Sequence, residues 1–162
     1  MARFEEFDRY LSKSDPDLMG WHEHAYEVAV EQLSIFEPAD WEQLCLALRT
    51  RDRAWRMCLV TVVEPEHSPI AGDLLLEMTG DPDVEIAFEA LRRTCFYCGV
   101  LTVKGVVRID PKIQVPGFLR RARAIHSLPG RASQLSAQSA TEFRAEVAAF
   151  VELLGGSESG GA

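Results

Sequence analysis

The sequence lacks the features of membrane-spanning proteins and of the common enzyme classes. No run of 18 residues is apolar, so no segment is expected to cross a membrane as a helix. Residues 1–8 are acidic and contain no apolar stretch, which predicts that they are not a secretory signal. No GxSxG, P-loop or dinucleotide motif occurs, and no single pair of carboxylates stands out for acid–base catalysis. We therefore expect a protein that is not an enzyme and that uses no cofactor.

Cysteine is scarce, and its spacing does not fit a metal site. The chain has four cysteines, all in apolar runs, which is typical of reduced thiols in a cytosol. Cys95 and Cys98 form one CxxC pair, but a structural zinc site needs four ligands, and Cys45, Cys58 and the histidines are scattered. We predict no bound metal and expect Cys95 and Cys98 to be packing residues near a helix end. A redox or metal role for this pair is the alternative.

Lysine is almost missing from the first 100 residues, where Lys13 is the only one. Residues 1–90 hold 20 of the 25 acidic residues and 7 of the 17 basic ones, and the remainder of the chain is net basic. The net charge of −8 argues against nucleic-acid binding, which requires a basic surface. It favours a basic protein as the partner. We expect the basic cluster at residues 120–123 to face the chain's own acids or solvent.

Prolines and apolar spacing predict an all-α fold. Proline fits the first position of a helix, because its missing N–H would have no partner there. A preceding Asp or Ser can cap the first turn, and Asp15, Ser68 and Asp81 each precede a proline, as does Glu37. Apolar residues then recur at helical spacing, as in Trp21, Ala25 and Val28. The predicted helices span residues 3–12, 16–35, 38–49, 53–64, 69–79 and 82–97. Their short connections predict antiparallel packing of successive helices.

Two of the predicted hairpins share a sequence pattern at an offset of 29 residues, which is typical of a stacked helical repeat. The second, from Leu74 to Leu91, has an apolar helix, an Asp-Pro-Asp turn and a second helix, and it resembles a HEAT-like repeat. Glu85 departs from that family's pattern, which has a basic residue after the turn valine. The resemblance covers about residues 38–95 and implies a short right-handed stack of antiparallel helical hairpins, a HEAT-like α-solenoid. Two unrelated amphipathic hairpins are the alternative.

The second half has a less regular pattern and predicts an irregular C-terminal part. Within residues 100–109, Lys104-Gly105 lies between two β-branched runs, which is typical of a small β-hairpin, but a helix interrupted at Gly105 fits the same residues. Because an isolated hairpin is only marginally stable, we favour helix or irregular structure here. Further helices are predicted at 116–127 and 141–154. Residues 1–154 are expected to form a single helical domain, followed by a flexible Gly/Ser tail at 155–162.

Acidic residues recur every four positions on two of the predicted helices. Like charges at this spacing destabilise a helix by about 0.2–0.5 kcal/mol per pair, whereas interleaved lysines would stabilise it. A solvated face that favours solubility is one explanation. The other is an electropositive partner, with a partly exposed Trp41 as its apolar anchor, although a core position is the alternative for Trp41. The candidate partner-binding residues are Glu23, Glu27, Glu31, Trp41, Asp81, Glu85 and Glu89.

In size, acidity and the Leu74–Leu91 run, the chain resembles immunity proteins of bacterial polymorphic toxin systems, the kind deployed by contact-dependent or type VI delivery. The resemblance implies a cytosolic antitoxin whose acidic face covers the cationic cleft of a cognate toxin and excludes its substrate. A toxin that acts on nucleic acid or a nucleotide would have such a cleft. No individual residue role is carried over from the resemblance. The alternative is a non-enzymatic scaffold or adaptor that holds a peptide or protein subunit.

Overall fold

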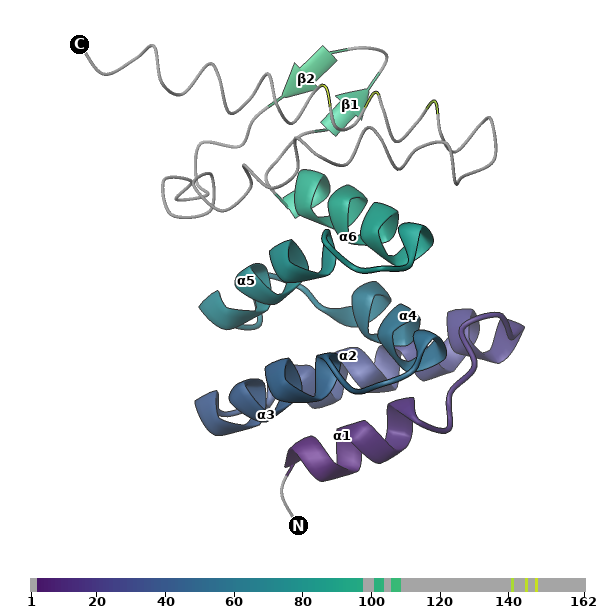
Figure 1. Ribbon diagram of the computed structural model, residues 1–162, viewed down its shortest axis with the longest axis vertical. Helices are drawn as coiled ribbons and strands as arrows, with labels where there is room; N and C mark the ends of the chain where they lie inside the picture. The colour runs from purple at the N-terminus through teal and green to yellow at the C-terminus, as the bar shows by residue number, and fades with distance from the viewer. Residues whose placement is uncertain are drawn as a thin grey trace, which may run out of the picture. The chain divides into compact units, whose positions relative to one another are not determined.

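The computed structural model describes residues 3–97, 101–103 and 106–108, together with the single positions 141, 145 and 148. The described part is mainly helical, which confirms the helical class of the prediction (Figure 1). The predicted helix at 116–127, most of that at 141–154, the basic cluster and the Gly/Ser tail lie outside the described residues. The helical elements are α1 (Arg3–Leu11), η1 (Trp21–Ala25), α2 (Tyr26–Ser34), α3 (Pro38–Leu48), α4 (Arg53–Val62), α5 (Pro69–Met78) and α6 (Val84–Tyr97).

The chain divides into two compact units, residues 1–74 and 75–162, and the division falls inside α5. The expectation of one helical domain from 1 to 154 stays a prediction.

The first unit is built around aromatic side chains. Phe7, Trp41 and Trp55 are fully buried. Phe36 lies between Phe7 and Trp41, with ring centroids 5.3 and 5.5 Å away and interplanar angles of 78° and 72°. Such edge-to-face pairs contribute about 0.5–1.5 kcal/mol each beyond the burial of their area. This row of rings joins α1, α3 and the α2–α3 connection in one core.

The carboxylate of Asp40 caps two helices at once. It is buried, and its Oδ2 accepts the Glu37 N–H at 3.0 Å as part of the capping box of α3. Its Oδ1 accepts the Phe4 N–H of α1 at 3.2 Å. The first N–H groups of a helix have no partner within the helix, so one carboxylate here satisfies donors of both helix starts. The Asp40 side chain therefore faces inward, although Pro38 and Ala39 before it are exposed.

An ion pair holds the other end of α1. The Arg51 guanidinium donates from Nε to Asp8 Oδ1 at 2.7 Å and from a terminal nitrogen to Oδ2 at 2.5 Å. The neighbouring Asp52 caps α4, because its carboxylate accepts the Trp55 N–H at 2.9 Å. Two adjacent residues of the α3–α4 turn thus fix both α1 and the start of α4.

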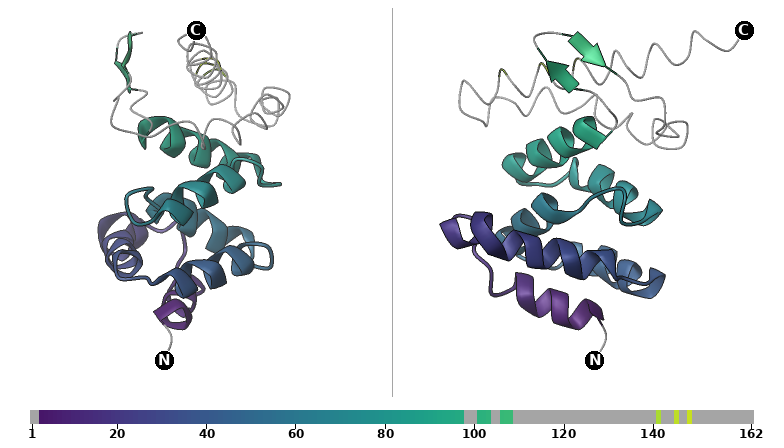
Figure 2. Two further views of the ribbon diagram at one scale, coloured as in Figure 1. Left: turned by 90° about the vertical axis from the view of Figure 1, so that its left-hand side faces the viewer. Right: turned by 180° about the vertical axis from the view of Figure 1, so that it is seen from behind.

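The predicted helix over 16–35 begins later than expected and contains a π-helical turn. Asp15 accepts the Asp17 N–H at 3.0 Å, so Pro16 lies in a local side-chain turn. In η1 the N–H of Tyr26 donates to the carbonyl of Trp21, five residues back. Figure 2 shows η1 and α2 continuing as one rod along the first unit.

The π turn changes which residues of this rod are buried. In a regular α-helix, side chains twelve residues apart point in directions that differ by about 120°. The extra residue of a π turn reduces this difference by about 100°. Trp21, Ala29 and Leu33 therefore share the buried side, whereas Val28 is 41% exposed. The predicted apolar face of Trp21, Ala25 and Val28 was wrong for Val28, because it assumed uninterrupted α-helical spacing.

Two hydrogen bonds fix the π turn to neighbouring helices. The Tyr10 hydroxyl of α1 donates to the Ala25 carbonyl at 3.0 Å, and burial raises the pKa of Tyr10 above its ordinary value. The Trp21 indole N–H donates to Thr61 Oγ1 of α4 at 3.2 Å. The rod is thus anchored on its inner side by α1 and α4.

In the second unit, α6 begins two residues later than predicted. The Asp83 carboxylate accepts the N–H groups of Glu85 at 3.0 Å and Ile86 at 3.2 Å, so Asp83 caps the helix. Asp81 instead accepts the Asp83 N–H at 2.7 Å in the preceding turn. Along α6, Ala87, Phe88 and Leu91 are buried.

Residues 101–103 and 106–108 form two short strands. β1 (Leu101–Val103) pairs antiparallel with β2 (Val106–Arg108), and Thr102 lies opposite Val107. Paired strands, the alternative for residues 100–109, therefore occur where we favoured helix or irregular structure. The β-branched side chains of both runs suit extended backbone, and this local preference outweighs the weak tendency toward helix.

Candidate protein-binding surface

The first acidic row lies on the exposed side of the rod formed by η1 and α2. The side chains of Glu23, Glu27 and Glu31 are all exposed. Among the described residues, none of the three carboxylates has an ion-pair partner. The sequence offers none nearby, because no lysine or arginine occurs from residue 14 to residue 48.

The π turn helps to align the three carboxylates. Residues four apart on an α-helix differ by about 40° in direction, so Glu23 and Glu31 would diverge by about 80° on a regular helix. Glu23 lies inside η1, where each turn holds more residues and the step to Glu27 therefore turns less far. The widened turn reduces the divergence and brings the row closer to a straight line along the rod.

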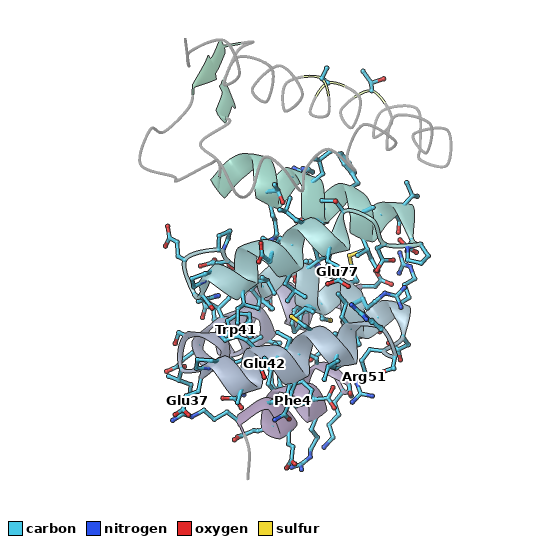
Figure 3. All side chains as sticks on the ribbon, turned by 60° about the vertical axis from the view of Figure 1, so that its left-hand side comes forward. Phe4, Glu37, Trp41, Glu42, Arg51 and Glu77 are labelled. Carbon is cyan, nitrogen blue, oxygen red and sulfur yellow. The ribbon has the colours of Figure 1, made fainter. Side chains whose placement is uncertain are left out.

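Trp41 does not belong to this surface. Its side chain is 1% exposed and lies among the side chains of the first unit (Figure 3). Phe36 packs edge-on against it, and the His67 ring lies 6.3 Å away at a tilt of 31°. The expected partly exposed anchor was wrong, because Asp40 turns inward to cap α1 and α3 and the next residue follows it into the core.

The second acidic row is largely used by the protein itself. Asp81 is buried, and its carboxylate is engaged in the turn before α6. Glu89 is half-buried, with Oε1 3.3 Å from Arg93 Nε and Oε2 3.7 Å from an Arg92 terminal nitrogen. Glu85 is exposed. The expectation of a continuous acidic row on α6 was therefore wrong, because two of its members are buried or neutralised.

Exposed apolar side chains were missed by the sequence patterns. In the described part, five large apolar side chains are exposed, and four of them lie between residues 18 and 35. They are Leu18, Met19, Val28 and Ile35, and Leu46 of α3 is the fifth. The only available signal was that the 16–35 segment has more apolar residues than one buried stripe accommodates. The surface of the rod thus combines carboxylates with apolar groups.

The described residues include one unreactive thiol and no cluster of metal ligands. Cys58 is fully buried, and burial raises the pKa of its thiol to about 12, which keeps it protonated and unreactive. No group of three potential metal ligands occurs among the described side chains. The side chains of Cys95 and Cys98 lie outside the described residues.

Burial favours the neutral form of His67 inside the first unit. Its Nδ1 accepts the Glu64 N–H at 3.3 Å, so the neutral ring is engaged in the α4–α5 connection. Burial lowers the pKa of His67, and the nearby carboxylates of Glu64 and Glu66 offset this only in part. Packing explains both the burial of His67 and its Nδ1 hydrogen bond, so neither observation requires a catalytic role.

None of the helices in the described ranges is both long and apolar enough for a membrane span. Comparison of the chain with protein-family models finds no matching family. No curated protein and no solved structure matches it either.

Proposed function

We propose that this protein is an immunity protein, a non-enzymatic antitoxin that binds a basic cognate protein through the exposed row Glu23, Glu27 and Glu31. The observation that carries the proposal is that no lysine or arginine of this rod offsets its negative charges. Three exposed carboxylates follow each other at the spacing that destabilises a helix, and the surrounding 35 residues contain no lysine or arginine. Binding to a cationic surface would offset this repulsion.

The inhibitory mechanism is occlusion. An acidic rod placed on a cationic cleft excludes an anionic substrate such as a nucleic acid or nucleotide, and it needs no chemical step. Opposite charge also speeds the encounter of the two proteins, so association should be fast and should slow at high salt. Neither a cofactor nor a metal takes part, and the site of action is the cytosol of the producing cell.

The proposal also includes the arrangement of the helices. We infer a short HEAT-like stack of helical hairpins, supported by the 29-residue offset between the two similar segments and by the helical structure over residues 3–97.

Glu85 is the one remaining exposed member of the second acidic row, and within the second unit it serves as a secondary contact for the basic partner.

Charge reversal with a matched control tests the proposal. The partner is first identified by co-purification from the native host, and its affinity is then measured by calorimetry. The triple variant Glu23→Lys/Glu27→Lys/Glu31→Lys should lose at least 100-fold in affinity. The control changes three other exposed acids of the first unit to lysine by the same total charge: Glu5, Glu6 and Glu42.

The control should lose less than about tenfold, since its charges act only over a distance. Equal losses in both triples would show that net charge alone governs binding. Unchanged affinity in the first triple would refute the acidic rod as the contact surface. A partner that belongs to a housekeeping complex and is not a toxin would favour the scaffold function instead.

A further inference from the structure

The exposed apolar side chains of the rod stand next to its carboxylates. Val28 and Ile35 are 41% and 57% exposed, and their spacing of seven residues, nearly two helical turns, puts them on one side of the rod. Glu31 is three residues after Val28 and four before Ile35, so it neighbours both. Glu27 continues the acidic row one turn earlier. The rod therefore presents an apolar strip bordered along its length by carboxylates.

An exposed methionine lies at the start of the rod, and hydrogen bonds from Arg3 mark the other end of the strip. Met19, 72% exposed, precedes the buried Trp21 at the start of the rod. At the other end, a terminal nitrogen of Arg3 donates to the Ile35 carbonyl at 2.7 Å and to Glu37 Oε1 at 2.8 Å. Arg3 is thus engaged by a carboxylate and a helix-end carbonyl, and it does not neutralise the acidic row.

We propose that this strip is the docking site for a basic amphipathic helix of the partner protein. The inference rests on the proposed function and specifies which part of the partner binds. Apolar residues of the docked helix cover Val28 and Ile35, while its lysines and arginines meet the row of three carboxylates. A helix matches the site because two neighbouring helices contact each other through residues three and four apart, the spacing at which the strip is built.

Charge complementarity selects this occupant over two others. A second copy of the chain would bring an identical acidic row against the first, and like charges in contact oppose association. The surface of a bilayer that contains anionic lipids would repel the same carboxylates. A basic helix alone gains from both the apolar and the acidic part of the strip.

A pair of synthetic peptides tests the proposal on the full chain. One is a 16-residue peptide of leucine and lysine with leucines on a single helical face. The other has the same sequence but contains several D-residues, which prevent helix formation while keeping composition and charge. Calorimetry gives the affinities, and amide chemical-shift mapping locates the contact. The helical peptide should bind at least tenfold more tightly, with the shifts concentrated at residues 18–35.

Two variants separate the apolar contact from the charge. Val28→Ser/Ile35→Ser leaves every charge in place and should weaken the helical peptide at least tenfold. Leu46→Ser, at a more exposed apolar position on α3, should change its affinity less than twofold. Circular dichroism of both variants should match the native chain, because all three side chains are exposed.

Several results would overturn the docking site. Equal binding of the two peptides, or shifts spread over exposed acids elsewhere in the first unit, would leave only a diffuse electrostatic surface. Self-association that Val28→Ser/Ile35→Ser abolishes would identify a second copy as the occupant, and flotation with phosphatidylcholine–phosphatidylglycerol vesicles would identify a lipid surface. The proposed antitoxin function is tested separately by the triple charge reversal with the native partner, so either proposal can fail alone.

Discussion

Replacement of Trp41 decides whether this residue belongs to the core or to the binding surface. The side chain is 1% exposed, and its ring is in edge-to-face contact with Phe36. Truncation of a buried tryptophan to alanine costs about 3–5 kcal/mol, since it removes buried area and leaves a cavity. The lost ring contact accounts for about 0.5–1.5 kcal/mol of aromatic pairing. We expect Trp41→Ala to lower the free energy of unfolding by about 4 kcal/mol.

Such a loss is a large part of the total stability of a small domain, so a milder variant is needed as well. Trp41→Phe keeps an aromatic ring beside Phe36 and should cost about 1–3 kcal/mol, as partial truncations of core side chains do. Urea denaturation followed by far-ultraviolet circular dichroism measures both values. Leu46→Ala in the same helix is the control and should stay within about 0.5 kcal/mol of the native chain, because Leu46 is exposed.

The core assignment would be refuted if Trp41→Ala cost less than about 1 kcal/mol, a value typical of surface positions. Affinity gives a second criterion. Trp41→Phe, measured where the protein is fully folded, should bind the partner as tightly as the native chain. A loss of affinity without a loss of stability would restore Trp41 as a contact residue.

Four further outcomes are expected. Because burial lowers the pKa of His67, the imidazole of the unfolded chain takes up a proton at higher pH than that of the folded chain. The free energy of unfolding should therefore fall by at most about 1.4 kcal/mol per pH unit as the pH drops below 6.5. His67→Gln should reduce this slope, as measured by urea denaturation. Native Cys58, with its thiol pKa raised to about 12, should resist iodoacetamide at pH 8 and react once urea unfolds the chain, as peptide mass spectrometry would show. A double-mutant cycle of Asp8→Asn and Arg51→Met should give a coupling energy of about 1 kcal/mol, which is small because Arg51 is partly exposed. A coupling energy of zero would mean that the ion pair orders the turn without stabilising the fold. Glu27→Lys should raise the free energy of unfolding by about 1 kcal/mol and weaken partner binding.

The helix starts show what local chemistry could and could not predict. Pro38 and Pro69 begin α3 and α5 as expected, and Ser68 accepts the Ile70 N–H at 3.2 Å without delaying the start of α5. Before Pro16 and Pro82, an aspartate binds the backbone N–H two residues on and forms a turn of its own, so the helix begins later. Both arrangements satisfy the same backbone groups, and the sequence does not reveal which is lower in free energy.

The candidate surface was predictable in part for similar reasons. Helical spacing placed Glu23, Glu27 and Glu31 correctly on one exposed rod. The neutralisation of Glu89 by Arg92 and Arg93 could have been read from the sequence, since these residues are three and four positions apart. The exposure of Val28 could not, because the π turn is stabilised by contacts such as the Tyr10–Ala25 hydrogen bond, which joins residues distant in the sequence.

The Glu27→Lys variant separates a binding surface from a merely solvated one. Glu27 stands between Glu23 and Glu31, so a lysine there converts two repulsive pairs into two attractive ones, each worth about 0.2–0.5 kcal/mol in either state. This one substitution should therefore raise the free energy of unfolding by about 1 kcal/mol, and the native chain does not have it. If the acids only keep the protein in solution, the variant should be more stable and bind every partner as before. If the row is a contact surface, the same substitution should stabilise the fold and weaken binding by at least tenfold. Urea denaturation and calorimetry on one preparation measure both effects, and a gain in stability without loss of affinity would refute the acidic rod as a site of recognition.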